Sequence, residues 1–570
     1  MGKQASYRGN PADRVRFLQQ RLMVVMVVFA LGYTAILVRI GNVAVSHHKV
    51  DNRYTDGTEK ELSLYQRANI VDRNGTLLAV NLTTASLYAD PKALLDPQEA
   101  VDKLKKIFPE INAKKLRTQL ASEKRFVWIK RNLTPSEQHA VNRLGIPGVY
   151  FQKGESRVYP HGNLMAHVLG FTGIDGHGLS GVEKTFDDFL SGKGQHTSEE
   201  AMEPLRLSID VRVQDVLHQA LLKSKEQFKA IGASGIILDA DTSQIVAMVS
   251  LPDFDPHNPS EATDLERFNR NTLGVYEMGS TFKAFNTAVG FDTGKITMNS
   301  SYDVSRPIRI ARFTIKDSHA VHGYMTVPEI FIHSSNIGSV HIAQDVGQEA
   351  QRAFIQKLGL LKKLSIELPE KSLPLYPDNW SKISSMTISY GHGIAVTPAH
   401  VVQAVGSLVN GGTFYPATLL ADPNMVHAEP RRVVTKDTSD KMRKLMRFAV
   451  VYGTGSKANA NGYLVGGKTG TADKPTHGNY GNKQSVISSF IGSFPMHQPK
   501  YVILVMVDEP KRSKEFPFVT AGVVAAPIVG QVVEQIAPIL GIPPVDSADE
   551  DIKREFWYKD DPKKEQVAVR

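Results

Sequence analysis

The chain has 570 residues, of which 42% are hydrophobic and 22% are charged. This length exceeds one ordinary hydrophobic core and this composition is globular, so we expect at least two folded domains. The net charge of +9 fits an anionic membrane or polymer surface and fits a basic soluble surface equally well. The absence of cysteine excludes thiol nucleophiles, disulfides and cysteine-ligated metals. RNA-binding aromatic motifs, zinc-finger spacings and nucleotide loops are also absent from the sequence, so nucleic acid is not an expected ligand.

An uncharged run near the N-terminus predicts a membrane anchor. Residues 22–38 would form a helix about 26 Å long at ~1.5 Å per residue, and residues 40–45 extend it toward the ~30 Å hydrocarbon core when Arg39 reaches the interface. Five basic residues and one acidic residue precede the run, and the positive-inside rule therefore places residues 1–21 in the cytoplasm and the rest outside. A cleaved signal peptide is the alternative, but Arg39 stands just before the candidate cleavage site. We therefore predict a transmembrane anchor over residues 22–45.

Residues 46–205 have a mixed pattern without a catalytic cluster. Short runs of strand type occur at residues 68–71 and 85–88, and a lysine-rich helical stretch lies near residues 98–122. Glycine is frequent from residue 154 to residue 194. This pattern predicts an irregular, β-rich module with a spacing or docking role.

The character of the chain changes at about residue 206. Four strongly apolar runs of strand type lie near the two ends of the remaining sequence, at residues 234–240, 245–250, 488–494 and 501–507. Between them the pattern is mostly helical, with helix starts at Thr326 and Thr397. Strands, then helices, then strands predict an α+β domain over residues 206–545, in which helices pack on an antiparallel sheet and an all-helical subdomain is inserted. Residues 546–570 are dense in charge and are expected to be a solvated tail.

Three short motifs occur in order along this domain. Ser280-Thr-Phe-Lys283 comes first, Ser334-Ser-Asn336 follows 54 residues later, and Lys468-Thr-Gly470 follows 134 residues after that. One match alone is weak evidence, because Ser46-His-His-Lys49 also fits the first pattern beside the predicted anchor. The ordered set of three is much harder to obtain by chance, and we interpret it as one catalytic site.

The first motif has the features of a serine nucleophile with a lysine base. Gly279 precedes Ser280, and the apolar stripe that follows predicts a helix starting near the serine. A helix start presents unpaired N–H groups and positive potential to the seryl oxygen. Lys283 lies one turn further on the same face, and it can act as a base when burial lowers its pKa from about 10.4. A capping serine and a surface lysine remain the alternative for this motif alone.

The second motif supplies polar groups within apolar surroundings. The hydroxyl of Ser334 can pass a proton between the base and a leaving amine, and the amide of Asn336 can hydrogen-bond a peptide. Ordinary capping of a helix end is the alternative for this motif.

The third motif predicts an edge strand that binds an extended peptide. The glycines before Lys468 allow another backbone to approach closely. Lys468 would offset the charge of a substrate carboxylate, which Thr469 and Thr471 would hydrogen-bond beside Gly470. The backbone N–H groups of Ser280 and Thr471 would then form an oxyanion hole.

Together these motifs resemble those of the serine penicillin-recognising enzymes, whose Ser-x-x-Lys, Ser-x-Asn and Lys-Thr-Gly elements line one cleft. Tyr276-Glu-Met-Gly279 resembles the Tyr-Glu-Pro-Gly that precedes the family's nucleophile, and residues 390–398 (YGHGIAVTP) resemble its Tyr-Gly-Gln-Gly…Thr-Pro stretch. Residues 67–75 (RANIVDRNG) resemble the Arg-Gly-x-Ile-x-Asp-Arg-Asn-Gly signature of class B members, with Ala68 in place of glycine. Arg157-Val-Tyr-Pro160 and residues 178–183 (GLSGVE) also fit this class.

The resemblance, over roughly residues 20–545, implies a class B penicillin-binding protein. It implies a pedestal or dimerisation-like domain over residues 46–205 and a penicillin-binding transpeptidase domain over residues 206–545. Lys283 would deprotonate Ser280, which attacks the penultimate D-alanine of a stem peptide ending in D-Ala-D-Ala, and an amine of a neighbouring stem peptide would take the acyl group. β-Lactams would leave a long-lived acyl-Ser280. No metal or cofactor is implied.

The resemblance is greatest to the division-specific, septal peptidoglycan transpeptidases of Gram-negative-like bacteria, and the elongation-specific relative is the close rival. The implied location is the inner membrane, with the catalytic domain in the periplasm. The implied partners are a membrane-embedded glycan polymerase of the SEDS family and other divisome proteins. A β-lactamase, a D,D-carboxypeptidase and a non-catalytic β-lactam sensor are the alternative functions.

Overall fold

The computed structural model divides the chain into two compact units, Met1–Gln66 and Arg67–Arg570. Among the residues that the structure describes, no helix is both long and apolar enough to cross a membrane. Most of the predicted anchor, and the whole of the predicted cytoplasmic tail, lie outside those residues. The described residues are 23–24, 26–27, 29–34, 36, 67–192, 203–310, 313–317, 323–422, 429–474 and 485–556.

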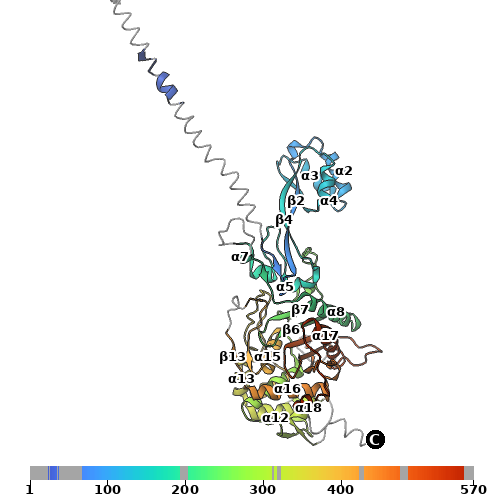
Figure 1. Cartoon of the computed structure of the whole chain (residues 1–570). Helices are drawn as coiled ribbons and strands as arrows, with labels where there is room; N and C mark the ends of the chain where they lie inside the picture. The colour runs from blue at the N-terminus through green and yellow to red at the C-terminus, as the bar shows by residue number, and fades with distance from the viewer. Residues whose placement is uncertain are drawn as a thin grey trace, which may run out of the picture. The chain divides into compact units, whose positions relative to one another are not determined.

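The first sheet belongs to the predicted pedestal. β1 pairs in parallel with β5, whereas β2 pairs in antiparallel fashion with β1, β3 and β4. β2 and β4 face each other from Val80 and Val158 to Ala89 and Val149. Figure 1 shows these two long strands leading into a lobe formed with three helices, residues 82–154, which we call the head. The strands are β1 (Ile70–Val71), β2 (Leu77–Ala89), β3 (Val127–Leu133), β4 (Val149–Val158) and β5 (Leu205–Arg206).

The lysine-rich stretch near residues 98–122 is helical, as predicted, but it forms two helices. The first stops at Phe108, which precedes Pro109 and is therefore held out of the helical region at φ −121° and ψ 79°. Asn112 caps the second by accepting a hydrogen bond from the Lys115 amide. The helices of the head are α2 (Pro97–Ile107), α3 (Ala113–Leu120) and α4 (Pro135–Asn142).

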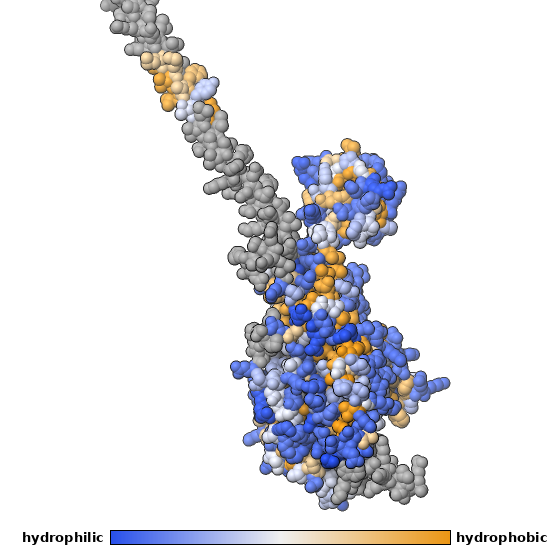
Figure 2. Space-filling model, in the orientation of Figure 1, coloured by the Kyte–Doolittle hydropathy of each residue, from blue (hydrophilic) through white to orange (hydrophobic). Residues whose placement is uncertain are grey.

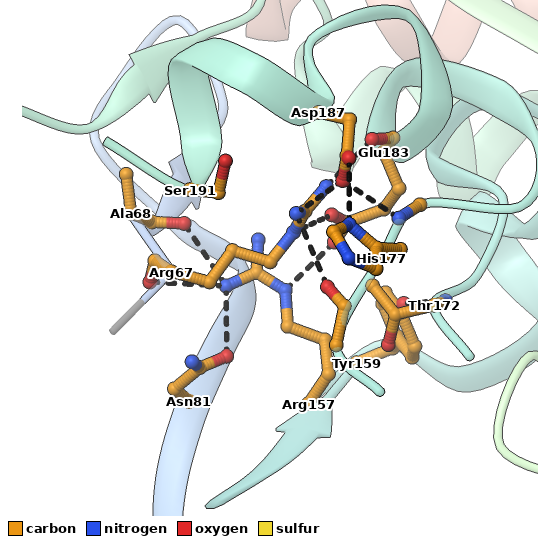
Figure 3. Close-up of polar contacts among 12 residues, drawn as sticks. Arg67, Ala68, Asn81, Arg157, Tyr159, Thr172, His177, Glu183, Asp187 and Ser191 are labelled. Atoms are coloured by element: carbon orange, nitrogen blue, oxygen red, sulfur yellow. Dashed lines mark hydrogen bonds and ion pairs between the residues drawn. The ribbon is translucent and has the colours of Figure 1, made fainter. Parts of the chain in front are cut away.

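A buried ion-pair cluster ties distant parts of the pedestal together (Figure 3). Glu183 is fully buried and accepts from Nε of Arg67 at 2.6 Å and from Nε of Arg157 at 2.7 Å. Arg67 also contacts Asp187 at 2.7 Å, and Arg157 donates to the carbonyl of Ala68 at 2.9 Å. The arginines come from two of the stretches that resemble class B members, residues 67–75 and 157–160. The glutamate comes from a third such stretch, residues 178–183. Because a buried charge is costly unless it is paired, this cluster fixes how those stretches fold together.

The second sheet confirms the predicted antiparallel core of the catalytic domain. Its order is β14-β15-β16-β6-β7, so the first and last parts of the domain meet in the middle of one sheet. All neighbouring strands are antiparallel. β14 stands at one edge. The strands are β6 (Gly232–Asp239), β7 (Ile245–Leu251), β14 (Gly466–Asp473), β15 (Val486–Phe494) and β16 (Tyr501–Asp508).

Helices cover both faces of this sheet, which explains why its strands are apolar at every position rather than at alternate ones. Along β16, Ile503 and Val505 pack in a core with α8 and α17, whereas Val502 and Leu504 pack in a core with α10, α15 and α16. The covering helices are α8 (Val211–Gln227), α10 (Lys283–Asp292), α15 (Pro398–Val409), α16 (Lys436–Val451) and α17 (Ala525–Ile539).

The insertion between the two halves of the sheet is mainly helical, as predicted, and its described residues also form three short two-stranded sheets. The predicted helix start at Thr326 is confirmed by a capping box with Glu329. Its elements are α11 (Val327–His333), α12 (Asn336–Val346), α13 (Gln348–Lys357), α14 (Lys382–Ile388), β8 (Ser301–Asp303), β9 (Ile308–Ile310), β10 (Phe313–Ile315), β11 (Tyr324–Thr326), β12 (Thr413–Phe414) and β13 (Arg431–Arg432).

The C-terminal segment differs in part from the predicted solvated tail. Glu550–Glu555 form helix α18, and Phe556 is only 9% exposed because it joins the core. Ile552, one turn earlier on the same face, packs against that core as well. Arg443 of α16 contacts Glu555 at 3.3 Å. The charged side chains therefore lie on a helix that docks through two apolar residues.

Candidate active site

The nucleophile turn lies where a short 3₁₀ segment, Gly279–Phe282, leads into α10. Ser280 is half-buried there, and its hydroxyl makes no hydrogen bond to the described residues. Gly279 has φ +52°, and a Cβ on it would lie 2.8 Å from the Thr471 carbonyl oxygen. Met278, which replaces the family's proline, has φ −85° and is fully buried, so the turn keeps a backbone that proline nearly matches.

Lys283 is buried at the first turn of α10, as the sequence predicts. Its side-chain nitrogen lies within hydrogen-bond distance of three acceptors: the Ser334 carbonyl, the Ser334 hydroxyl at 3.1 Å and Oδ1 of Asn336 at 2.8 Å. Burial holds the pKa of Lys283 well below its ordinary value, and the positive charge of Lys468 lowers it further, while the charge of Asp317 opposes both effects. These surroundings favour a neutral amine, which is the form a general base needs.

Lys468 reaches the same hydroxyl from the opposite side. It extends from the edge strand β14, is fully buried, and donates to the Ser334 hydroxyl at 2.9 Å. Its nitrogen lies 5.8 Å from the centre of the Phe331 ring. Burial lowers the pKa of Lys468 to about 7. Two lysines with depressed pKa values therefore share one serine hydroxyl, which gives a continuous path for a proton.

Ser334 has an unusual backbone for a residue other than glycine. It ends α11 in the left-handed region, with φ 61° and ψ 42°. This conformation costs roughly 1–2 kcal/mol relative to ordinary backbone and persists only where neighbouring contacts impose it. The two lysines bonded to Ser334 supply such contacts, and the start of α12 supplies others.

Asp317 organises the start of α12, and the sequence analysis missed it. Its carboxylate accepts hydrogen bonds from the Ser335 hydroxyl at 2.7 Å, from the backbone N–H of Asn336, and from the backbone N–H of Ile337 at 3.1 Å. A carboxylate at a helix N-terminus satisfies free N–H groups and the positive end of the dipole. No sequence motif marks Asp317. It precedes the second motif, Ser334-Ser-Asn336, and lies just after the short strand β10.

Strand β14 presents an edge beside the nucleophile turn. Gly470 packs so closely that a Cβ would meet the Met278 carbonyl at 2.5 Å. The Thr471 carbonyl faces Gly279. Because the N–H and C=O of one strand residue point to the same side, the Thr471 N–H also faces this turn rather than β15.

The threonine hydroxyls of β14 are partly engaged. The hydroxyl of Thr469 contacts that of Thr454 at 2.6 Å, and the hydroxyl of Thr471 accepts from the Ala521 N–H at 3.0 Å. Thr471 keeps its own hydrogen to donate, since a hydroxyl is both donor and acceptor. Thr454, in the loop after α16, is another residue that the motifs did not reveal.

A second loop supports the nucleophile turn. Tyr276 and Val396 exchange backbone hydrogen bonds of 2.9 and 3.0 Å, and Glu277 accepts from His392 at 2.7 Å. Gly391 has φ +86°, and a Cβ there would lie 2.0 Å from the Gly279 oxygen. The two family-like stretches before the nucleophile and at residues 390–398 are therefore in direct contact. A cavity of about 530 Å³ opens beside them, lined in part by Glu277, Gly393 and Asp473.

Four of the predicted site residues, Lys283, Ser334, Asn336 and Lys468, are linked by hydrogen bonds, and a fifth, Ser280, lies one helical turn from Lys283. Thr469, Gly470 and Thr471 lie on the adjoining edge strand. A buried lysine one turn from a serine, with a second lysine relayed through a hydroxyl, is suited to acyl transfer.

Comparisons with known proteins agree with this geometry. Residues 233–534 match the penicillin-binding protein transpeptidase domain, and residues 64–203 match the penicillin-binding protein dimerisation domain. The chain is 39% identical over 547 residues to the probable peptidoglycan D,D-transpeptidase FtsI of Caulobacter vibrioides, covering 93% of this chain and 90% of that protein. It is 30% identical to stage V sporulation protein D of Bacillus subtilis, covering 92% and 87%. It is 29% identical to peptidoglycan D,D-transpeptidase FtsI of Escherichia coli, covering 84% of each.

A solved structure shares the fold. The crystal structure of penicillin-binding protein 3 from Mycobacterium tuberculosis, complexed with aztreonam, superposes with a TM-score of 0.66 at 24% identity, covering 84% of this chain and 97% of that one. The chain therefore belongs to the penicillin-binding protein family, and the pairing of a dimerisation domain with a transpeptidase domain makes it a class B member.

Proposed function

We propose that this chain is a peptidoglycan D,D-transpeptidase that cross-links stem peptides at the division septum through an acyl-Ser280 intermediate. The observation that carries the proposal is the buried Lys283–Ser334–Lys468 relay beside Ser280. The FtsI relatives, at up to 39% identity, are named as peptidoglycan D,D-transpeptidases, which supports the same reaction.

In the proposed first half-reaction, neutral Lys283 takes the proton of the Ser280 hydroxyl as its oxygen attacks the carbonyl of the penultimate D-alanine. The N–H groups of Ser280 and Thr471 stabilise the oxyanion. The bond to the terminal D-alanine breaks, and the proton passes from Lys283 through the hydroxyl of Ser334 to the leaving amine. The products are an ester on Ser280 and free D-alanine.

In the second half-reaction, an amine from a neighbouring stem peptide attacks the ester. A new amide forms, the bond to Ser280 breaks, and the amine's proton returns to the serine oxygen through the same relay. In the first half-reaction, Lys468 and the hydroxyls of Thr469 and Thr471 hold the carboxylate of the terminal D-alanine before it leaves. In both half-reactions, Asn336 orients the peptide through the one amide hydrogen that it does not donate to the Lys316 carbonyl. The peptide pairs with the free edge of β14 beside Gly470.

We further propose that residues 22–45 anchor the chain in the inner membrane, with residues 46–545 in the periplasm. A SEDS-family glycan polymerase and other divisome proteins are the proposed membrane partners. The support is the uncharged run and its basic flank. Depletion of the protein tests the septal assignment: filamentous cells are expected, whereas round cells would favour the elongation-specific alternative.

Intact-protein mass after incubation with a penicillin tests the nucleophile. The wild type is expected to gain one stable adduct, Ser280→Ala none, and Ser300→Ala, a control at another half-buried serine, the same adduct as the wild type. An adduct that survives in Ser280→Ala contradicts the mechanism. Rapid loss of the wild-type adduct would favour a β-lactamase. Release of D-alanine without cross-linked product would favour a D,D-carboxypeptidase, and acylation without turnover of any stem peptide would favour a sensor.

A further inference from the structure

One face of the sheet in the head carries a row of aromatic side chains. Trp128 of β3, Tyr88 of β2 and Tyr150 of β4 are directly opposite one another in the strand register. The ring of Tyr88 lies 6.2 Å from that of Trp128 and 5.6 Å from that of Tyr150. Phe126 stacks on Tyr88 at 4.7 Å with an angle of 24° between the rings. We call these four residues the aromatic row.

The aromatic row lies on the open face of its sheet. The opposite face, which includes Leu87 and Ala89, forms the core with α2, α3 and α4. On the open face, Phe126 and Tyr150 remain 44% and 45% exposed. Exposed aromatic side chains gathered on one surface indicate a binding site more often than chance, because water contact with them is costly.

Polar side chains continue the same face beyond the aromatic row. Along β2, Ser86 and Thr84 follow Tyr88 at alternate positions, and along β4, Gln152 and Gly154 follow Tyr150. A Cβ on Gly154 would lie 3.7 Å from the Ser86 hydroxyl and 3.8 Å from the Thr84 hydroxyl, which places all three on one face. The surface is thus an aromatic platform beside hydroxyl and amide groups.

The head is also strongly basic. Residues 82–154 contain 13 lysines and arginines and 7 aspartates and glutamates. The guanidinium of Arg131 lies 4.4 Å from the Trp128 ring, so a positive charge stands on the aromatic row itself. Figure 2 shows mostly hydrophilic residues on the visible surface of the head. An anionic ligand is therefore favoured at this face.

We propose that the aromatic row binds glycan strands of peptidoglycan. The face of an aromatic ring carries negative potential, and the C–H groups of a pyranose ring are its electropositive complement. The hydroxyl of Thr84, which is half-buried, and the exposed amide of Gln152 can hydrogen-bond sugar hydroxyls, whereas Ser86 is buried between them. The free carboxylates of the stem peptides can form ion pairs with the guanidinium of Arg131. The choice of this polymer rests on the proposed function, since the transpeptidase site would act on the same material.

A protein partner fits this face less well. A stable protein interface buries roughly 800 Å² on each side around an apolar core. Here the aromatic row is bordered by polar side chains and by Arg131, and one exposed aliphatic side chain, Leu82, lies further along the same face of β2. A polyhydroxylated, anionic chain matches that composition better.

Sedimentation with purified, protein-free peptidoglycan sacculi tests the proposal. Full-length protein in detergent is first acylated with a penicillin, so that the transpeptidase site is blocked and the adduct reports that the catalytic domain is folded. Phe126→Ala/Tyr150→Ala is compared with Tyr324→Ala/Phe518→Ala, a matched pair at aromatic residues 74% and 66% exposed elsewhere. We expect the first pair to lower the sacculus affinity about tenfold and the control pair to leave it unchanged.

Two further measurements test the charge of Arg131 and the contact between the glycan and Trp128 separately. Arg131→Glu, which removes no core contact, is expected to weaken binding and make it less sensitive to salt. Glycan chains stripped of stem peptides are expected to change the fluorescence of Trp128 in the wild type but not in Trp128→Phe. If the wild type and Phe126→Ala/Tyr150→Ala sediment equally with sacculi, the proposal is overturned, and a protein becomes the better candidate for the ligand of the aromatic row. Absence of the penicillin adduct would instead count against the proposed function.

Discussion

Asp317 offers a sensitive test of how the active site is held together. Its half-buried carboxylate accepts three hydrogen bonds at the start of α12. Asp317→Ala leaves those donors to water, and we expect it to lower the free energy of unfolding by about 2–3 kcal/mol, within the range for lost charged hydrogen bonds and caps. Because Asn336 and Ser334 then lose their fixed positions, we expect penicillin acylation to slow by about 100-fold.

Asp317→Asn separates charge from geometry. The amide oxygen can keep the two backbone hydrogen bonds, so acylation at its optimum should fall less than about tenfold. The negative charge of Asp317 raises the pKa of Lys283, so its removal lowers that pKa and the acidic limb of the pH–rate profile should move to lower pH. Stopped-flow acylation from pH 5 to 9 measures both effects. Asp303→Asn, an exposed carboxylate of the same insertion, is the control. A limb that moves to higher pH, or Asp317→Ala acylating at the wild-type rate, refutes this reasoning.

Three other outcomes are expected. Glu183→Ala should lower stability by about 3–5 kcal/mol in thermal unfolding, because it leaves the buried guanidinium of Arg157 without its carboxylate and Arg67 with Asp187 alone; an unchanged Tm would contradict this role. Gly391→Ala should slow acylation and lower Tm, because a Cβ would clash with the Gly279 backbone oxygen at a position of positive φ; acylation at the wild-type rate would argue against that contact. Acylation should rise with pH as Lys283 loses its proton, and Lys468→Met should move the midpoint to higher pH, because the charge of Lys468 lowers the pKa of Lys283; a shift to lower pH would contradict the coupling.

The sequence predicts the central sheet and several helix starts because local signals agree with the fold. The four apolar runs correspond to β6, β7, β15 and β16, all buried on two faces. Thr326 and Thr397 cap the helices that they were expected to start. Lys468 lies on an edge strand, as the flanking glycines indicate. Such features depend on a few neighbouring residues, so they can be read from the sequence alone.

Other features depend on contacts between distant residues, and the sequence could not reveal them. The left-handed backbone of Ser334 arises where Lys283 and Lys468 converge on it from elements far apart in the chain. Asp317 arrives on a hairpin whose strands are only three residues long, too short for a clear period. The docking of α18 rests on Ile552 and Phe556, two apolar residues within a charged segment.

The proposed recognition of peptides through the edge of β14 has a consequence for how resistance to inhibitors can arise. An extended ligand would pair there with backbone N–H and C=O groups, which every substitution along the strand except proline preserves, and its carboxylate would contact the side chains of Lys468, Thr469 and Thr471. Because those side chains would bind the carboxylate of the substrate and of its mimic alike, changing them gives selection little means of excluding the mimic alone. Changes that discriminate between drug and substrate must instead alter the surroundings of the strand, such as the turn at Gly279, the loop at Gly391 or the anchoring of α12 by Asp317.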